Sequence, residues 1–179
     1  MATPPSDALL LVDGYNVIGA WSSLKKACDR HGLESARHEL VEILINYTAH
    51  QGYRTQVVFD SQYQDTPGTQ EAYTPCLSVY YTAFEQTADT YIEKICAGRD
   101  RQARIIVATS DRAQKLTVMG YGAEWMSAQR LELEIDQSAR RMRCQQRPQK
   151  VSGGRFLVNS LDAKVQQKLH QMRYGISSR

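Results

Sequence analysis

Four acidic residues in this 179-residue sequence stand where an apolar run ends or where a helix is expected to begin. Asp13 directly follows Leu-Leu-Leu-Val, Asp60 follows Val-Val-Phe, and Asp111 follows Ile-Ile-Val-Ala after an intervening Thr-Ser. Asp89 opens an expected helix, and Glu93 lies four residues later on the same helical face. The carboxyl ends of parallel strands meet at one edge of a sheet, so these distant carboxylates are expected to converge there.

A carboxylate cluster of this kind predicts a divalent cation. Like charges raise one another's pKa, which makes a bare cluster destabilising, and Mg²⁺ or Mn²⁺ relieves the repulsion because both prefer oxygen ligands. Such ions share their coordination with substrate phosphates, so the expected chemistry is metal-assisted phosphoryl transfer or hydrolysis. Taken singly, each aspartate is more simply explained as a turn former or a helix N-cap. Asp60 opens a long loop and is expected at the margin of the site, and Glu85 is a further candidate.

The elements that would position these acids alternate between strands and helices. Short apolar runs predict strands at 8–12, 55–59, 77–81, 104–108 and 123–126. Helical patterns cover 18–30, 34–50, 87–97, 111–119 and 128–145, and the polar segment 61–74 is expected to be a surface loop. This alternation predicts an α/β fold with a parallel sheet and three layers. We expect one domain over 1–146, followed by a basic extension, 147–179, with a linker and a helix at 161–173.

The net charge of +3 is distributed unevenly along the chain. Residues 1–136 carry 12 Lys and Arg against 18 Asp and Glu, a net of −6, whereas residues 137–179 carry ten against one, a net of +9. Basic residues that follow an acidic body are suited to neutralising the phosphates of a polyanion, although charge runs are often only solvated helix faces. The candidates for contact with RNA or the ribosome are Arg140, Arg141, Arg143, Arg147 and Lys150.

Several other classes of protein are disfavoured. No stretch approaches the roughly 18–20 apolar residues that span a bilayer, and the first residues do not resemble a secretory signal, so we expect no membrane partner. The four cysteines form no Cys-x-x-Cys pair, which favours free thiols in a reducing compartment over disulfides. There is no Gly-x-Ser-x-Gly elbow for a serine nucleophile, and Asp13-Gly14-Tyr15 is not the Asp-x-Asp of an aspartyl phosphatase.

The segment from Leu11 to Trp21, LVDGYNVIGAW, resembles the opening motif of YacP-type NYN domains, a branch of the PIN-like ribonucleases. The resemblance continues in order through residues 9–135, with family-like spacing. The segments that carry it are Ala36-Arg37, Val57-Val58-Phe59-Asp60, Thr87-Ala88-Asp89, Ile92-Glu93, Val107-Ala108-Thr109-Ser110-Asp111, Gly122-Ala123 and Ser127-Ala128. A lone Asp-Gly-Tyr-Asn would be a weak signal, but the ordered set is specific.

The resemblance implies a sheet in which the five expected strands lie in the order 3-2-1-4-5. It implies Asp13, Asp89 and Asp111 as metal-site acids and Asn16 as their catalytic partner. Asp60 and either Glu93 or Glu85 would complete the acidic site. Ser110, beside Thr109, is expected to offer its hydroxyl and N–H to a phosphate.

Two further kinds of side chain are candidates for contact with RNA. Arg37 would pair either with an acid or with RNA, and the sequence does not decide between the two. Tyr63, Tyr73, Tyr80 and Tyr81 are candidates for stacking on bases, although most tyrosines are expected in the core or at its rim.

By resemblance, the chain is similar to bacterial ribosome-associated endoribonucleases and their cyanobacterial and plastid relatives. The function expected is therefore metal-dependent endonucleolytic cleavage of mRNA or rRNA, with Mg²⁺ or Mn²⁺, RNA as partner and the ribosome as a further candidate partner. The expected compartment is the bacterial cytoplasm, or the plastid stroma in a plant. The alternative is a catalytically inactive RNA- or ribosome-binding module on the same fold.

Overall fold

The structure is a computed structural model that describes residues 8–61, 67–98 and 104–146. The chain divides into two compact units, Met1–Met142 and Arg143–Arg179. The first unit contains every strand of the described chain. The linker expected at 147–154 and the helix expected at 161–173 lie outside the described residues, so the boundary after residue 146 stays a prediction.

A six-stranded sheet forms the centre of the first unit, in the order β3-β4-β2-β1-β5-β6. All neighbouring strands run parallel except β3, which pairs antiparallel with β4 at one edge. The five strands expected from the sequence occur in the expected relative order, and β3 is an addition to it. The strands are β1 Leu9–Asp13, β2 Arg54–Phe59, β3 Thr69–Thr74, β4 Leu77–Tyr81, β5 Ile105–Ala108 and β6 Glu124–Met126.

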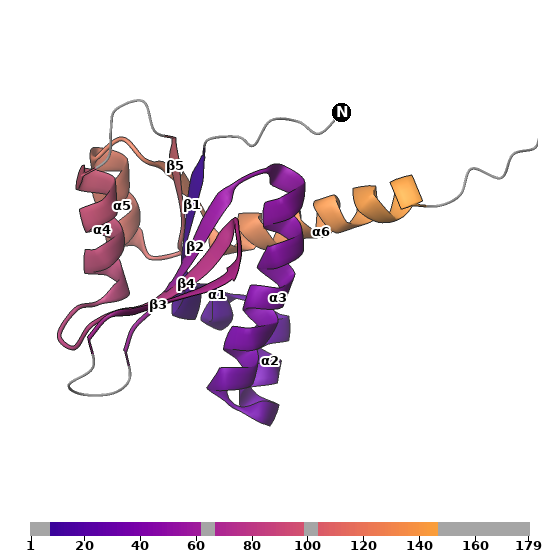
Figure 1. The fold of residues 1–179 in the computed structure, drawn as a ribbon, viewed down its shortest axis with the longest axis horizontal. Coiled ribbons are helices and arrows are strands. Elements are labelled where there is room, and N and C mark those ends of the chain that lie inside the picture. The colour runs from indigo at the N-terminus through magenta and orange to yellow at the C-terminus, as the bar shows by residue number, and fades with distance from the viewer. Residues whose placement is uncertain (1–7, 62–66, 99–103, 147–179) are drawn as a thin grey trace, which may run out of the picture. The chain divides into compact units, whose positions relative to one another are not determined.

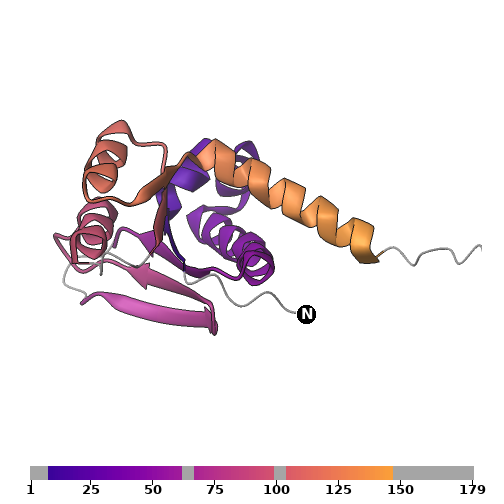
Figure 2. The same ribbon diagram turned by 90° about the horizontal axis from the view of Figure 1, so that it is seen from above.

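Helices cover both faces of this sheet, which confirms the three-layer α/β class (Figures 1 and 2). Residues of β1 alternate between two apolar cores: Leu10 and Val12 pack with α1, α2, α3 and the start of α6, whereas Leu11 packs with α4 and α5. Figure 1 shows α4 and α5 on one side of the strands and α2 and α3 on the other. The helices are α1 Gly14–Ala20, α2 Ser22–His31, α3 Leu33–Gln51, α4 Ala88–Gly98, α5 Arg112–Gly120 and α6 Ala128–Gln146.

The helix expected at 18–30 is in fact two helices that meet at Trp21. Trp21 is extended, with φ −89° and ψ 122°, and it ends α1. Its buried indole N–H donates to the carbonyl of Ala128 at 2.7 Å, so a contact 107 residues away holds the break in place. A local pattern of apolar residues cannot reveal such a distant constraint.

The prediction of a surface loop over residues 61–74 was wrong for its second half, because residues 69–74 form the strand β3. Five of the six β3 residues are exposed, so the segment lacks the alternation of buried and exposed residues that marks a strand in sequence. Pairing with β4 supplies the strand instead, with Glu71 opposite Val79 and Thr69 opposite Tyr81.

Two features of the chain concern its surroundings. Across the described residues, no helix has the length and apolar character to cross a lipid bilayer. Cys28, Cys76, Cys96 and Cys144 are all free thiols.

Candidate functional site at the carboxyl edge of the sheet

Asp13 is the last residue of β1 and the N-cap of α1. The residue is only 8% exposed, and its Oδ1 accepts the backbone N–H of Asn16 at 3.2 Å. Gly14 makes the turn after it possible, because a Cβ there would lie 2.1 Å from the ring of Phe59. The chain therefore packs an aromatic ring against the turn that holds this carboxylate.

The surroundings of Asp13 disfavour its charged form. Burial raises its pKa from the ordinary 3.8 to about 6, against the opposing effect of the hydrogen bond from Asn16. The negative charges of Asp89, Asp60 and Asp111 raise it further. The structure thus brings together four aspartates that come from four different parts of the sequence.

Asp89 lies in the first turn of α4 and belongs to the same cluster. Its side chain is more exposed than that of Asp13, and its pKa is raised by partial burial and then by Asp111, Asp60 and Glu93. Glu93 therefore lies within electrostatic reach of the cluster. Glu85 is exposed in the loop before α4 with a positive φ of 61°, and Glu93 is the acid that the structure associates with Asp89.

Asp60, expected at the margin, has a structural connection to this helix. Its Oδ1 accepts the N–H of Ala88, the first residue of α4, and so holds the start of the helix beside β2. The hydroxyl of Thr87 accepts the N–H of Thr90 at 3.2 Å, as expected for an N-cap. Both contacts fix the turn from which Asp89 projects.

Asp111 is the N-cap of α5, and two backbone N–H groups in the first turn of that helix donate to the same oxygen of its carboxylate. Oδ1 accepts the N–H groups of Ala113 at 2.7 Å and Gln114 at 3.0 Å. Asp13 and Asp111 therefore perform the simpler capping role that each suggests alone, and both also contribute charge to the cluster.

Asn16 connects the first and fourth of the expected strand ends. Its Oδ1 accepts the backbone N–H of Ser110 at 2.7 Å, across 94 residues. The hydroxyl of Ser110 in turn donates to Gln129 Oε1 at 3.2 Å and accepts the N–H of Ala128 at 3.3 Å. The N–H of Ser110 that was expected to contact phosphate bonds to Asn16 instead, so Asn16 and Ser110 join the loops after β1 and β5.

Arg37, which the sequence left open between an acid and RNA, lies among aromatic rings. Its guanidinium carbon is 5.7 Å from the ring centre of Tyr15 and 5.9 Å from those of Phe59 and Tyr81. Such distances are within the range of cation–π attraction. These three rings come from α1, β2 and β4, and no sequence pattern connects them; only the strand register places them together.

The other predicted contacts are distributed more widely. Arg140, Arg141 and Arg143 are exposed on α6, whereas Arg147 and Lys150 lie outside the described residues. Tyr80 stacks on Tyr91 with ring centres 4.0 Å apart. The expected base-stacking residues Tyr73 and Tyr81 line a pocket beside Arg37, and Tyr63 lies outside the described residues.

The donor set suits a hard cation, but not one enclosed by protein ligands alone. Within residues 8–61, 67–98 and 104–146, no group of three His, Cys, Asp or Glu side chains has the arrangement to hold a metal ion. Mg²⁺ commonly binds through one or two carboxylates and completes its shell with waters and substrate phosphates. The carboxylates fit an ion of this water-rich kind, since the repulsion at Asp13 would be relieved by a positive charge.

Comparison with known proteins identifies the family. The sequence model of the YacP-like NYN domain matches residues 10–174. This chain belongs to the YacP-like NYN domain family. The protein YacP of Bacillus subtilis (strain 168) is 37% identical to it over 136 residues, which are 75% of this chain and 78% of YacP.

Solved structures of the family have the same fold. The crystal structure of Rae1 (YacP) from Bacillus subtilis superposes with a TM-score of 0.65 at 31% identity, covering 93% of this chain and 95% of Rae1. A single-residue mutant of Rae1 gives the same TM-score at 29% identity, covering 92% and 99%. The NYN and PIN-like class is of nuclease type, which agrees with the carboxylates at the sheet edge.

Proposed function

We propose that this chain is a metal-dependent endoribonuclease that hydrolyses RNA phosphodiester bonds at the carboxyl edge of its sheet. The observation that carries the proposal is the environment of Asp13, a buried carboxylate whose pKa is raised to about 6 by burial and by three neighbouring aspartates. Perturbed carboxylates gathered from distant elements are typical of functional sites, because they cost stability and need a compensating partner. The family to which the chain belongs supports a nuclease.

Asp13, Asp89 and Asp111 would hold the cation, one or two of them directly and the rest through bound water, with Asp60 and Glu93 at its margin. A bound Mg²⁺ or Mn²⁺ would supply positive charge to the phosphodiester and lower the pKa of a nearby water. The side chains of the protein would bind and position the cation and the RNA. Without a cation, burial and the neighbouring aspartates raise the pKa of Asp13 to about 6, so cation binding would compete with protonation of this carboxylate below about that pH.

Asn16 is a positioning residue in this proposal. By accepting the N–H of Ser110, it holds the loop that precedes Asp111 against the turn that follows Asp13. Its amide group retains N–H donors that can reach a phosphate oxygen. The distance between the two central strand ends, and therefore between two of the proposed metal ligands, depends on this bridge.

The proposed substrate is mRNA or rRNA in the cytoplasm, with the ribosome as a working partner. Support comes from the net charge of +9 over residues 137–179 and from the exposure of Arg140, Arg141 and Arg143. Each phosphate neutralised on a single strand contributes about 0.7 to the slope of log affinity against log salt. Replacing these three arginines with glutamine should weaken RNA or ribosome binding and flatten that slope by about 2. An unchanged slope in a filter-binding titration would show that this surface does not contact RNA.

The test of the activity compares RNA cleavage by the full chain with Mg²⁺, with Mn²⁺ and with a chelator. We expect cleavage with a cation only, and its loss in Asp13→Asn and Asp89→Asn. Asp29→Asn, an exposed aspartate on α2, is the matched control and should cut like the wild type. If the Asp13 and Asp89 variants cut as fast as the wild type, the proposed site is wrong.

A second candidate function is a binding module that has lost catalysis. One observation favours it: the described residues contain no group of three side chains arranged to hold a metal ion. The two functions separate on translating ribosomes, where the full chain would sediment with ribosomes in both cases. An enzyme would cut the bound mRNA, and the module would leave it intact.

A further inference from the structure

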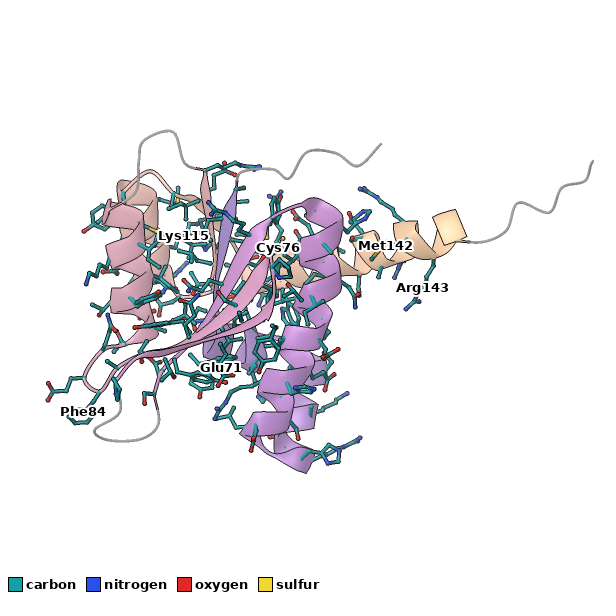
Figure 3. All side chains as sticks on the ribbon, viewed as in Figure 1. Glu71, Cys76, Phe84, Lys115, Met142 and Arg143 are labelled. Carbon is teal, nitrogen blue, oxygen red and sulfur yellow. The ribbon has the colours of Figure 1, made fainter. Side chains whose placement is uncertain are left out.

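A pocket of about 200 Å³ lies between α3 and the hairpin formed by β3 and β4. Arg37 and Glu34 reach it from α3, Glu71 and Tyr73 from β3, and Tyr81 from β4. Figure 3 labels Glu71 on the hairpin, at the side that α3 occupies. None of these residues belongs to the carboxylate cluster described above.

The register of the hairpin explains why these side chains meet. Glu71 pairs with Val79, which is buried in the core on the α3 side of the sheet. The register of the hairpin shifts between Ala72 and Thr74, and with this shift Glu71 and Tyr73 both line the pocket. The hydroxyl of Tyr73 donates to Glu71 Oε2 at 3.4 Å, so the two side chains support one another at the mouth of the pocket. The ring of Tyr73 is 41% exposed and leaves an aromatic face available.

The pocket is a neighbour of the proposed cleavage site. Tyr81 and Phe59 are the last residues of β4 and β2 and pair with each other in register. Asp60 follows Phe59, and β1, which ends at Asp13, is the next strand along. Two strand spacings, about 10 Å, therefore separate the strand of Tyr81 from the strand of Asp13 at the same edge.

The chemistry of the lining selects among possible occupants. A phosphate is disfavoured, because two carboxylates, Glu34 and Glu71, oppose the guanidinium of Arg37. His38 also lines the pocket, but its imidazole Nε2 lies 3.9 Å from the carboxylate of Glu42. A metal ion is disfavoured by the same guanidinium. The volume is below the roughly 300–1,000 Å³ of pockets that hold drug-sized ligands, which points to one small planar group. A base splayed out of a single strand fits, since such bases stack on aromatic rings and are hydrogen-bonded along their edges.

We propose that this pocket binds one guanine base of the RNA substrate, next to the bond that is cut. Guanine presents two adjacent N–H donors on one edge and the acceptors O6 and N7 on another. The carboxylate of Glu71 accepts from the two donors, and the guanidinium of Arg37 donates to O6 or N7. The ring of Tyr73 stacks on the base. Adenine presents a donor where guanine has O6 and lacks the paired donors, so the pocket discriminates against it.

This inference rests on the proposed nuclease function for its substrate, and its test is therefore a binding measurement that needs no cleavage. The full-length Asp13→Asn variant is titrated at fixed salt with fluorescent single-stranded RNA oligonucleotides that carry guanine, inosine or adenine at one position in an otherwise uridine sequence. We expect guanine to bind about tenfold or more tightly than adenine. Inosine, which lacks the 2-amino group, should fall between them.

Variants of the pocket identify the residues that discriminate. In the same background, Glu71→Gln should reduce the preference for guanine over adenine to less than about twofold, and Tyr73→Ala should weaken all three RNAs together. Glu39→Gln, an exposed carboxylate on α3 outside the pocket, should keep the full preference. Because Glu71 is exposed, its replacement leaves the fold intact, which a thermal melt verifies.

The outcomes separate the two proposals. Equal affinity for guanine and adenine, no binding of any of the RNAs, or a guanine preference that survives Glu71→Gln overturns the guanine pocket. If the guanine preference depends on Glu71 while the wild-type chain cuts no RNA, the pocket stands and the nuclease fails. If cleavage depends on Asp13 but binding shows no preference for guanine, the proposed nuclease function stands and the proposed guanine pocket is refuted.

Discussion

Replacing Asp13 with asparagine should stabilise the cation-free protein while it destroys the proposed activity. In the folded chain the pKa of Asp13 is raised from 3.8 to about 6, first by burial. The difference between these values corresponds to about 3 kcal/mol of unfavourable free energy at neutral pH, since one pKa unit is about 1.4 kcal/mol. The residue is 8% exposed, so solvent screens little of this cost.

The neutral variant removes that cost and introduces a smaller one. Asparagine is an equally good N-cap and still accepts the N–H of Asn16. Its buried amide adds donors without partners, which offsets about 1–2 kcal/mol of the gain. We expect a net stabilisation of about 1–2 kcal/mol at pH 8, or a rise in Tm of roughly 2–8 °C for a chain of this size.

The pH dependence gives the sign of the effect. Between pH 3.8 and about 6 the folded protein holds a proton on Asp13 that the unfolded chain has lost. The unfolding free energy of the wild type therefore decreases as pH rises through this window, and the cost is fully present above it. Below about pH 4 both states are protonated, so the advantage of Asp13→Asn should disappear.

The assay is a thermal melt of both proteins at pH 4 and pH 8, first with chelator and then with an excess of Mg²⁺. Mg²⁺ should raise the Tm of the wild type and leave that of Asp13→Asn nearly unchanged, because binding to the folded state alone stabilises it. Asp29→Asn should match the wild type within about 0.5 kcal/mol in every condition. A variant that is less stable than the wild type at pH 8 without cation would refute the reasoning, and so would a pH-independent difference.

Two other substitutions test the local architecture. Gly14→Ala places a Cβ 2.1 Å from the ring of Phe59 and should destabilise the fold by about 1–3 kcal/mol in urea unfolding. Gly19→Ala is the control: a Cβ there has nothing within 4 Å, so this variant should not be destabilised. Equal stability of the two variants would show that the ring yields. Asn16→Ala removes the acceptor for the N–H of Ser110 and should cost about 0.5–1.5 kcal/mol, together with a fall in cleavage rate. An unchanged Tm and cleavage rate would show that the hydrogen bond between Ser110 and Asn16 contributes neither to stability nor to activity.

Much of the acidic site could be predicted because strand ends are visible in sequence. Asp13, Asp60 and Asp111 follow buried apolar runs, and parallel strands align their carboxyl ends at one edge of the sheet. Asp89 was predictable from the helix signal that begins at Thr87. Their mutual proximity then follows from topology alone, without any knowledge of side-chain contacts.

What the sequence did not reveal depends on contacts between distant segments. The strand β3 is exposed along most of its length, so no burial pattern marked it, and with it the positions of Glu71 and Tyr73 were hidden. The bond from Ser110 to Asn16 spans 94 residues, and the aromatic rings around Arg37 come from three elements. Each of these features needs the register of the sheet, which local periodicity does not contain.

The central claim is that the carboxylate cluster cuts within an RNA strand with the help of a divalent cation. The most direct measurement uses a circular single-stranded RNA, which has no ends, incubated with the full-length chain, chelator and then added Mn²⁺ or Mg²⁺. The account predicts that the circle becomes linear only after the cation is added, and that Asp13→Asn leaves it closed. Linear RNA formed in the presence of chelator, or formed equally by Asp13→Asn, would contradict it.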